Sequence, residues 1–167
     1  MSLSKITPCL WFNTEAEAAA EFYTSIFPNS SITTIQRYTD AGKEYHGREA
    51  GSVMVVEFTI FNGQHTFTAL NGGPQFTFSE AISFQIDCED QAEVDYYWGA
   101  LSAGGDESRQ QCGWVVDRFG VAWQVIPRRL KEMLGGGDPV RSARVTSAMM
   151  TMKKLDVARL ERAFEGA

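Results

Sequence analysis

The feature of this sequence that most constrains its fold is an internal repeat. A shift of 74 residues places Tyr23 on Tyr97, within a longer match that keeps acidic as well as aromatic positions. A shift of 57 residues places Gly63 on Gly120, with apolar segments on both sides of each glycine. Chance agreement at two shifts is the less favoured alternative because the first match is extended. We therefore interpret the chain as a duplicated module.

Each half shows the same order of expected elements, namely a strand, a helix and three strands. In the first half these elements cover residues 6–12, 15–27, 31–38, 52–61 and 64–70. Asn13 or Thr14 is expected to cap the helix. Asn62-Gly63 predicts a two-residue hairpin turn, because both central positions of a type I′ turn need a positive φ.

The second half repeats this order more weakly. The expected elements cover residues 81–87, 89–101, 108–112, 113–117 and 121–126. The remaining residues, 128–167, predict helices interrupted by the glycines at 135–137. The predicted fold class is thus α+β, with modules at about 4–73 and 79–127 that form a domain over 1–127, followed by a helical tail over 128–167.

Several segments together resemble one known family. They are ITPCLWF, EAEAAAEFYTSIFPNS, NGQHTFTALNGGP, CEDQAEVDYYWGALSAGG and CGWVVDRFGVAWQVIP. They resemble the PhnB-like proteins, described as 3-demethylubiquinone-9 3-methyltransferase-like, a branch of the vicinal oxygen chelate superfamily that includes glyoxalase I and the extradiol dioxygenases. The resemblance implies a cupped mixed β-sheet with helices on the convex side, a cavity on the concave side and a homodimer.

The resemblance also implies where a metal would be held in metal-dependent members. Those positions fall near Thr7, Phe67, Ala81 and Gln124, and of these only Gln124 could coordinate an ion. Because metal sites need several converging donors, we expect no metal.

The methyltransferase name of the branch receives no support from the glycines. A common cofactor site of this class needs glycines between a strand and a helix. The pairs at 72–73 and 104–105 and the triplet at 135–137 lack that context. We therefore expect no methyl transfer and no cofactor.

Alternation along the strands predicts which side chains line a pocket. Leu10, Phe12, Ile82, Phe84 and Ile86 are expected to meet the helices. The predicted ligand-binding residues, which include aromatic rings, amides and a thiol, are Cys9, Trp11, Phe67, Ser83, Gln85, Trp114 and Gln124, joined by Ala69. The alternative is that the tryptophans only fill a core. Such a lining suits a small, partly apolar ligand.

The net charge and the cysteine content limit which partners and which cellular compartment we expect for this protein. The net charge is −6 and the pI is about 4.9, which argues against nucleic acid and anionic membranes as partners. Residues 1–127 carry 6 basic against 16 acidic side chains, whereas residues 128–167 carry 9 against 5, so the tail could lie on an acidic body or be a solvated helix. Three cysteines without a CxxC spacing favour reduced thiols in the cytoplasm.

These observations lead to one hypothesis and two alternatives. The first is a metal-free homodimer that binds a small organic molecule and acts as a binding protein or an enzyme. The second is an enzyme acting on an aromatic or quinone-like substrate, with Glu57, His65 or Cys9 as catalytic candidates; Asp117 is more typical of a turn. The third is an interaction protein whose basic tail docks on a partner.

Overall fold

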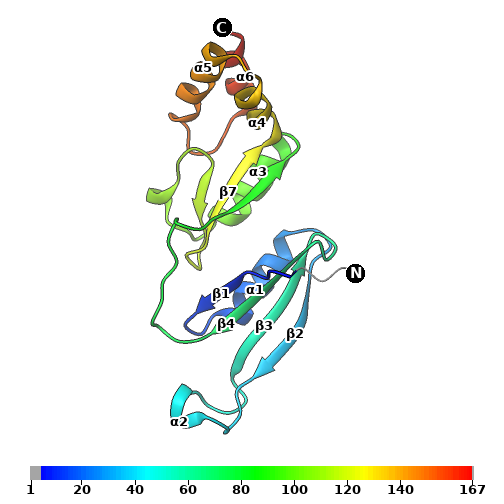
Figure 1. The fold of residues 1–167 in the computed structure, drawn as a ribbon, viewed down its shortest axis with the longest axis vertical. Helices are drawn as coiled ribbons and strands as arrows, with labels where there is room; N and C mark the ends of the chain where they lie inside the picture. Colours follow the sequence, from blue (N-terminus) through cyan, green and yellow to red (C-terminus); the bar gives the residue numbers. More distant parts are fainter. Residues whose placement is uncertain (1–4, 167) are drawn as a thin grey trace. The chain divides into compact units, whose positions relative to one another are not determined.

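The computed structural model describes residues 5–166, which form two compact units, one ending at Thr77 and the other beginning at Phe78 (Figure 1). The first unit contains β1 (Cys9–Phe12), α1 (Ala16–Ile26), β2 (Ser31–Arg37), α2 (Lys43–His46), β3 (Val53–Ile60) and β4 (His65–Asn71). The second unit contains β5 (Phe84–Cys88), α3 (Gln91–Ser102), a 3-10 helix at Glu107–Arg109, β6 (Trp114–Val116), β7 (Ala122–Pro127), α4 (Arg128–Gly135), α5 (Pro139–Met149) and α6 (Val157–Glu165).

The first unit is a four-stranded sheet in the order β1-β4-β3-β2, with α1 packed on one face. β1 runs parallel to β4, and the other neighbouring strands are antiparallel. Alternate strand residues are buried against α1, including Leu10 and Phe12 as expected, together with Val56 and Phe58. Burial of this apolar face stabilises the unit by roughly 25 cal/mol per Å² of apolar surface removed from water.

Helix α1 begins differently from the prediction. Its N-cap residue is Glu15, whose side chain makes no capping bond, so the expected cap at Asn13 or Thr14 is wrong. The Asn71 side chain, from the end of β4, instead accepts a hydrogen bond from the Ala16 N–H at 2.8 Å. A residue 55 positions away in the sequence thus replaces the local cap. No local sequence signal predicts this contact.

The turn between β3 and β4 is also longer than predicted. Ile60 pairs with His65, so four residues rather than two make the connection. Asn62 and Gly63 have the expected positive φ, and Phe61 shares it at 51°. The expected two-residue turn is therefore wrong, although the residues that favoured it adopt the required backbone conformation.

The second unit repeats the first with one strand fewer. Its sheet has the order β5-β7-β6, and β5 runs parallel to β7 as β1 does to β4. In α3, Tyr97 is buried like its counterpart Tyr23 in α1. The predicted α+β fold with two sheet modules is confirmed.

Two details of the second unit differ from the prediction. The expected strand over 108–112 is wrong, because a 3-10 helix and one isolated bridge, Gln111 to Trp114, stand there. Ile82 was expected to meet the helices but is 74% exposed. The pairing of β5 with β7 begins only at Phe84, opposite Trp123, so residue 82 lies outside the sheet.

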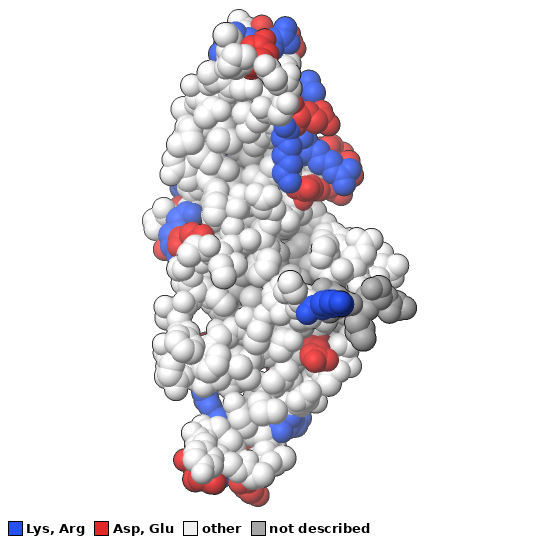
Figure 2. Space-filling view, viewed as in Figure 1, with Lys and Arg blue, Asp and Glu red and all other residues white. Residues whose placement is uncertain are grey.

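Residues 128–166 belong to the second unit. One apolar cluster joins strand residue Ile126 to buried residues of the three tail helices and the segment between them: Leu130, Met133, Val145, Met152, Leu155 and Leu160. The tail also pairs its charges within the unit, since Lys131 bonds Asp87, Arg128 bonds Glu89 and Lys154 bonds Asp95. Figure 2 shows this interleaving of basic and acidic side chains beside α3 and α4. The basic tail thus lies on acidic residues of its own chain.

Within residues 5–166, no helix combines the length and the apolar character that crossing a lipid bilayer requires.

Candidate functional site

A row of polar and aromatic side chains crosses the second sheet on the face turned away from α3, which we call the far face. Gln85 of β5 lies opposite Gln124 of β7, and Gln124 lies opposite Trp114 of β6. Residues directly opposite in neighbouring strands share a face. The other face carries the side chains buried beneath α3, such as Ile86 and Val125. The strand register therefore brings three of the predicted ligand-binding residues into one line.

Hydrogen bonds fix the amides of this row. The Gln124 Nε2 donates to the Ser83 Oγ at 2.7 Å, and the Gln85 Nε2 donates to the Gln124 Oε1 at 3.0 Å. The Gln124 amide is thereby held in one orientation. The Gln85 Oε1 has no hydrogen-bond partner in the described part of the chain, so it can accept a bond from a ligand.

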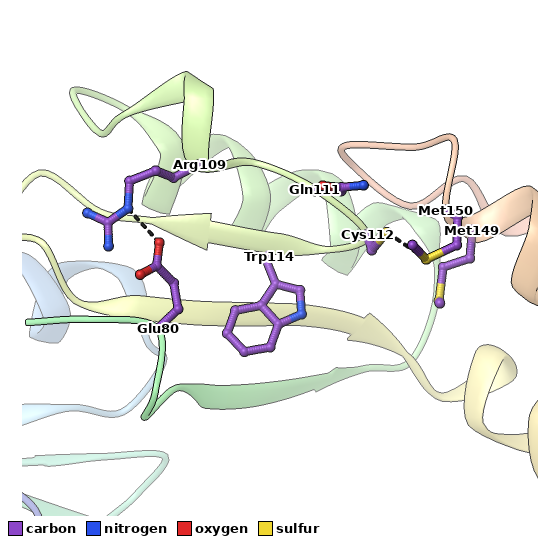
Figure 3. Close-up of a pocket in the computed structure, with 7 residues that line it drawn as sticks. All are labelled: Glu80, Arg109, Gln111, Cys112, Trp114, Met149 and Met150. Atoms are coloured by element: carbon purple, nitrogen blue, oxygen red, sulfur yellow. Dashed lines mark hydrogen bonds and ion pairs between the residues drawn. The ribbon is translucent and has the colours of Figure 1, made fainter.

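A pocket of about 480 Å³ opens beside this row (Figure 3). Its lining combines an aromatic ring, sulfur-containing side chains, an amide and an ion pair: Glu80, Arg109, Gln111, Cys112, Trp114, Met149 and Met150. Most of the lining surface is apolar. A pocket of this size and character fits a small organic molecule with one polar end.

The polar end of the pocket is the ion pair between Arg109 and Glu80. The Arg109 Nε donates to the Glu80 Oε1 at 2.6 Å. This hydrogen bond, more than the charge attraction, lowers the pKa of Glu80 to about 2, and it raises the pKa of Arg109. Both groups therefore stay charged at neutral pH.

The opposite end of the pocket is formed by the tail. The Cys112 N–H donates to the Met152 carbonyl and the Gly113 N–H donates to the Lys153 carbonyl, both at 2.8 Å. These bonds hold Met149 and Met150 against the turn that precedes β6. The tail was not among the predicted site residues, because a helical apolar pattern does not show what the helix will cover.

The predicted site residues divide between the two units. Gln85, Trp114 and Gln124 lie together on the second sheet, and Ser83, just before β5, accepts a hydrogen bond from Gln124. Of the residues that line the pocket, only Trp114 was predicted; the others are Glu80, Arg109, Gln111, Cys112, Met149 and Met150. Glu80 and Arg109 lie outside the strands, so alternation could not have found them.

Trp11 has a structural role in the first unit. Its Nε1 donates to the Gly73 carbonyl at 2.8 Å, and its ring contacts Phe76 edge-on. A Cβ on Gly72 would stand 2.2 Å from that ring, so the glycine is needed for the ring to lie there. Trp11 therefore packs on the loop after β4 rather than within the buried core.

Phe67 faces α1 rather than an open surface. Its ring stacks on Phe58 at 5.3 Å, and Phe58 stacks on Tyr23 of α1 at 5.8 Å. Ala69, two residues further along β4, is also fully buried. The expectation that Phe67 and Ala69 line a pocket is wrong. The predicted alternation assigned the residues of β4 to the wrong faces, because its apolar residues face the helix.

The three catalytic candidates do not converge. Cys9 pairs with Thr68, and Thr68 pairs with Glu57, so Cys9 and Glu57 share a face two strands apart. His65 lies two residues before Phe67 in β4, so its side chain is on the opposite face of the sheet from Cys9 and Glu57. Its ring is edge-on to that of Phe61. Partial desolvation raises the pKa of the Cys9 thiol, although the residue is exposed, and this lowers its reactivity at neutral pH.

Asp117 is a turn former, as its sequence context favoured. Its Oδ1 accepts bonds from the N–H groups of Phe119 and Val121, and its Oδ2 accepts one from the Trp123 Nε1 at 2.8 Å. The carboxylate is buried and engaged in holding the β6–β7 turn.

Two further features bear on metal and cofactor chemistry. Residues 5–166 contain no cluster of three or more His, Cys, Asp and Glu side chains arranged to hold a metal ion. Gly72 and Gly73 follow β4, and the next regular element is strand β5 rather than a helix. They therefore do not form the strand–glycine–helix site that binds a nucleotide-type cofactor.

Comparisons with known proteins agree on one family. A family model described as 3-demethylubiquinone-9 3-methyltransferase matches residues 4–126. The solved structure of a PhnB protein from Bacillus cereus is 33% identical over 74% of this chain and 99% of its own, with a TM-score of 0.63. Protein PA1353 from Pseudomonas aeruginosa is 21% identical over 75% of this chain and 98% of its own, with a TM-score of 0.55, and shares the fold. A search of the curated proteins finds no match.

Proposed function

We propose that this chain, which belongs to the family described as 3-demethylubiquinone-9 3-methyltransferase and to its PhnB-like branch, binds a small, partly apolar organic molecule on the far face of its second sheet. The observation that carries the proposal is the row Gln85–Gln124–Trp114 beside an apolar pocket. Side chains held by mutual hydrogen bonds bind a ligand with little loss of conformational entropy.

The chemistry of the lining indicates the kind of ligand. The Trp114 ring offers a flat apolar surface for an aromatic or aliphatic group. The Gln85 Oε1 can accept one hydrogen bond, and the Arg109 guanidinium can donate to an oxygen at the other end of the pocket. A molecule with an apolar body, an N–H or O–H group near Gln85 and an acceptor oxygen near Arg109 meets all three groups.

The proposal includes the remaining expectations from the sequence. The protein acts in the cytoplasm as a homodimer, without nucleic acid or membrane partners, and holds neither a divalent metal nor a methyl-transfer cofactor. The acidic pI and the lack of a donor set at the implied metal positions support these points. The family description names a methyltransferase, and we propose that this chain does not carry that activity.

A thermal-shift screen of quinones, aldehydes and antibiotics tests the binding proposal. A compound present at 100 times its Kd should stabilise the wild type by about 2.7 kcal/mol. Trp114→Ala and Gln124→Ala should remove most of this shift, because they delete the ring and the central amide of the row.

Gln36→Ala is the control, since Gln36 is exposed on β2 in the first unit. Its shift should equal that of the wild type. Compounds whose shift survives both site substitutions would contradict the proposed location. Incubation of each hit with the protein, followed by product analysis, separates a binding protein from an enzyme.

A further inference from the structure

Three sulfur-containing side chains line the tail end of the pocket. The Cys112 Sγ lies 3.6 Å from the Met150 Sδ, and Met149 lines the same pocket (Figure 3). We propose that Cys112, Met149 and Met150 form a binding site for Cu(I). This site does not depend on the organic ligand proposed above.

The donor atoms define the metal. Thiolate and thioether sulfurs are soft ligands, which prefer Cu(I) to the harder cations that carboxylates and carbonyls bind. The charged lining residues, Arg109 and Glu80, are bonded to each other on the far side of Trp114 in Figure 3. No metal was expected, on the evidence of the positions near Thr7, Phe67, Ala81 and Gln124; Cys112 and the two methionines lie elsewhere, so this site departs from that expectation.

The backbone places the thiol before any metal arrives. Cys112 and Gly113 both have positive φ, at 51° and 85°, in a tight turn closed by two hydrogen bonds between Gln111 and Trp114. Two more backbone bonds, to the carbonyls of Met152 and Lys153, tie this turn to the segment that carries the methionines. The sulfurs therefore come from two segments that are fixed to each other, and binding requires only rotation of side chains.

The charge balance also suits the surroundings. When Cu(I) binds, the Cys112 thiol releases its proton to water and a Cu–S bond forms, while both thioethers remain neutral. The thiolate and the monovalent ion together carry no net charge. A neutral centre costs little to place beside the apolar lining of the pocket.

The test is a titration of the full chain with Cu(I), without oxygen, in competition with a coloured Cu(I) chelator. The wild type should retain one equivalent. Cys112→Ser should retain none at this site. Replacing both Met149 and Met150 by Leu should weaken binding by more than about tenfold, because loss of even an outer partner of a metal ligand costs that much.

Cys9→Ser is the matched control, since Cys9 is an exposed free cysteine in the first unit, and it should bind as the wild type does. Leu has nearly the volume of Met, so the double variant should fold, which a urea midpoint checks. The proposal is overturned if the wild type loses all Cu(I) to the chelator, if Cys112→Ser or the double Leu variant binds as tightly as the wild type, or if Cys9→Ser abolishes binding.

Discussion

Arg109 and Glu80 show how a single ion pair prepares one end of a pocket. The Arg109 hydrogen bond lowers the pKa of Glu80 from an ordinary value of 4.5 to about 2. Because the pKa is lower in the folded state, the pair favours folding above pH 4.5, and this contribution disappears as the pH falls towards 2. The contribution is small, since Glu80 is exposed and Arg109 is only half-buried, so water screens the pair. Its main effect is to hold the guanidinium in place.

We predict that Arg109→Gln raises the pKa of Glu80 towards 4.5. The carboxylate then loses the charged donor that stabilised its ionised form. An NMR titration of the Glu80 carboxyl carbon measures the midpoint. Lys43→Gln is the control, because Lys43 pairs with Glu49 in the first unit and should leave the Glu80 midpoint unchanged. An unchanged midpoint in Arg109→Gln would show that the ion pair does not form in solution.

At the scale of elements, the start of α1 depends on β4. Asn71 accepts from the Ala16 N–H through its Oδ1 and donates to the Val53 carbonyl through its Nδ2, at 2.8 and 3.0 Å. The Tyr38 hydroxyl donates to the Asn71 carbonyl at 2.7 Å. The Asn71 side chain thus ties a helix and the start of β3 to β4, and its backbone carbonyl ties the segment after β2.

We predict that Asn71→Ala destabilises the protein by about 2–6 kcal/mol. The substitution leaves one N–H and one carbonyl unpaired away from water, and each such group costs about 1–3 kcal/mol. Urea denaturation measures the loss of free energy. The exposed Gln36→Ala should change it by less than about 0.5 kcal/mol. Equal midpoints for Asn71→Ala and the wild type would refute this role.

At the scale of the whole chain, the tail completes the second unit. Ile126 belongs to a sheet of three strands, and the tail helices cover it through their apolar cluster. The tail also supplies Met149 and Met150 to the pocket. A segment that the sequence presents as a basic appendage is therefore part of the core and of the candidate site.

We predict that Leu160→Ala destabilises the protein by about 2–5 kcal/mol, the range for deleting a buried leucine side chain. Leu160 of α6 is fully buried in the cluster. The control is Leu134→Ala in α4, whose side chain is 38% exposed and should lose far less. Urea denaturation compares the two variants. Similar losses would mean that α6 does not pack on the cluster in solution.

The sequence by itself determined the duplicated framework. The periodicity of strands and helices, the turn glycines and the matching aromatic positions are local features, and they recur at fixed distances along the chain. Tyr23 and Tyr97, for example, are both buried as the repeat predicts. Alternation also placed Gln85 and Gln124 on one face, as their strand register shows, but the same prediction joined them with Cys9, Trp11 and Phe67, which belong to the first unit.

Only the tertiary structure decided which face of β4 carries Phe67, what begins α1, and what the tail covers. Each of these depends on contacts between residues far apart in the chain, such as Ala16 with Asn71 or Cys112 with Met150. Local patterns carry no information about such contacts, because a residue is buried or hydrogen-bonded according to which distant segment the folded chain places against it.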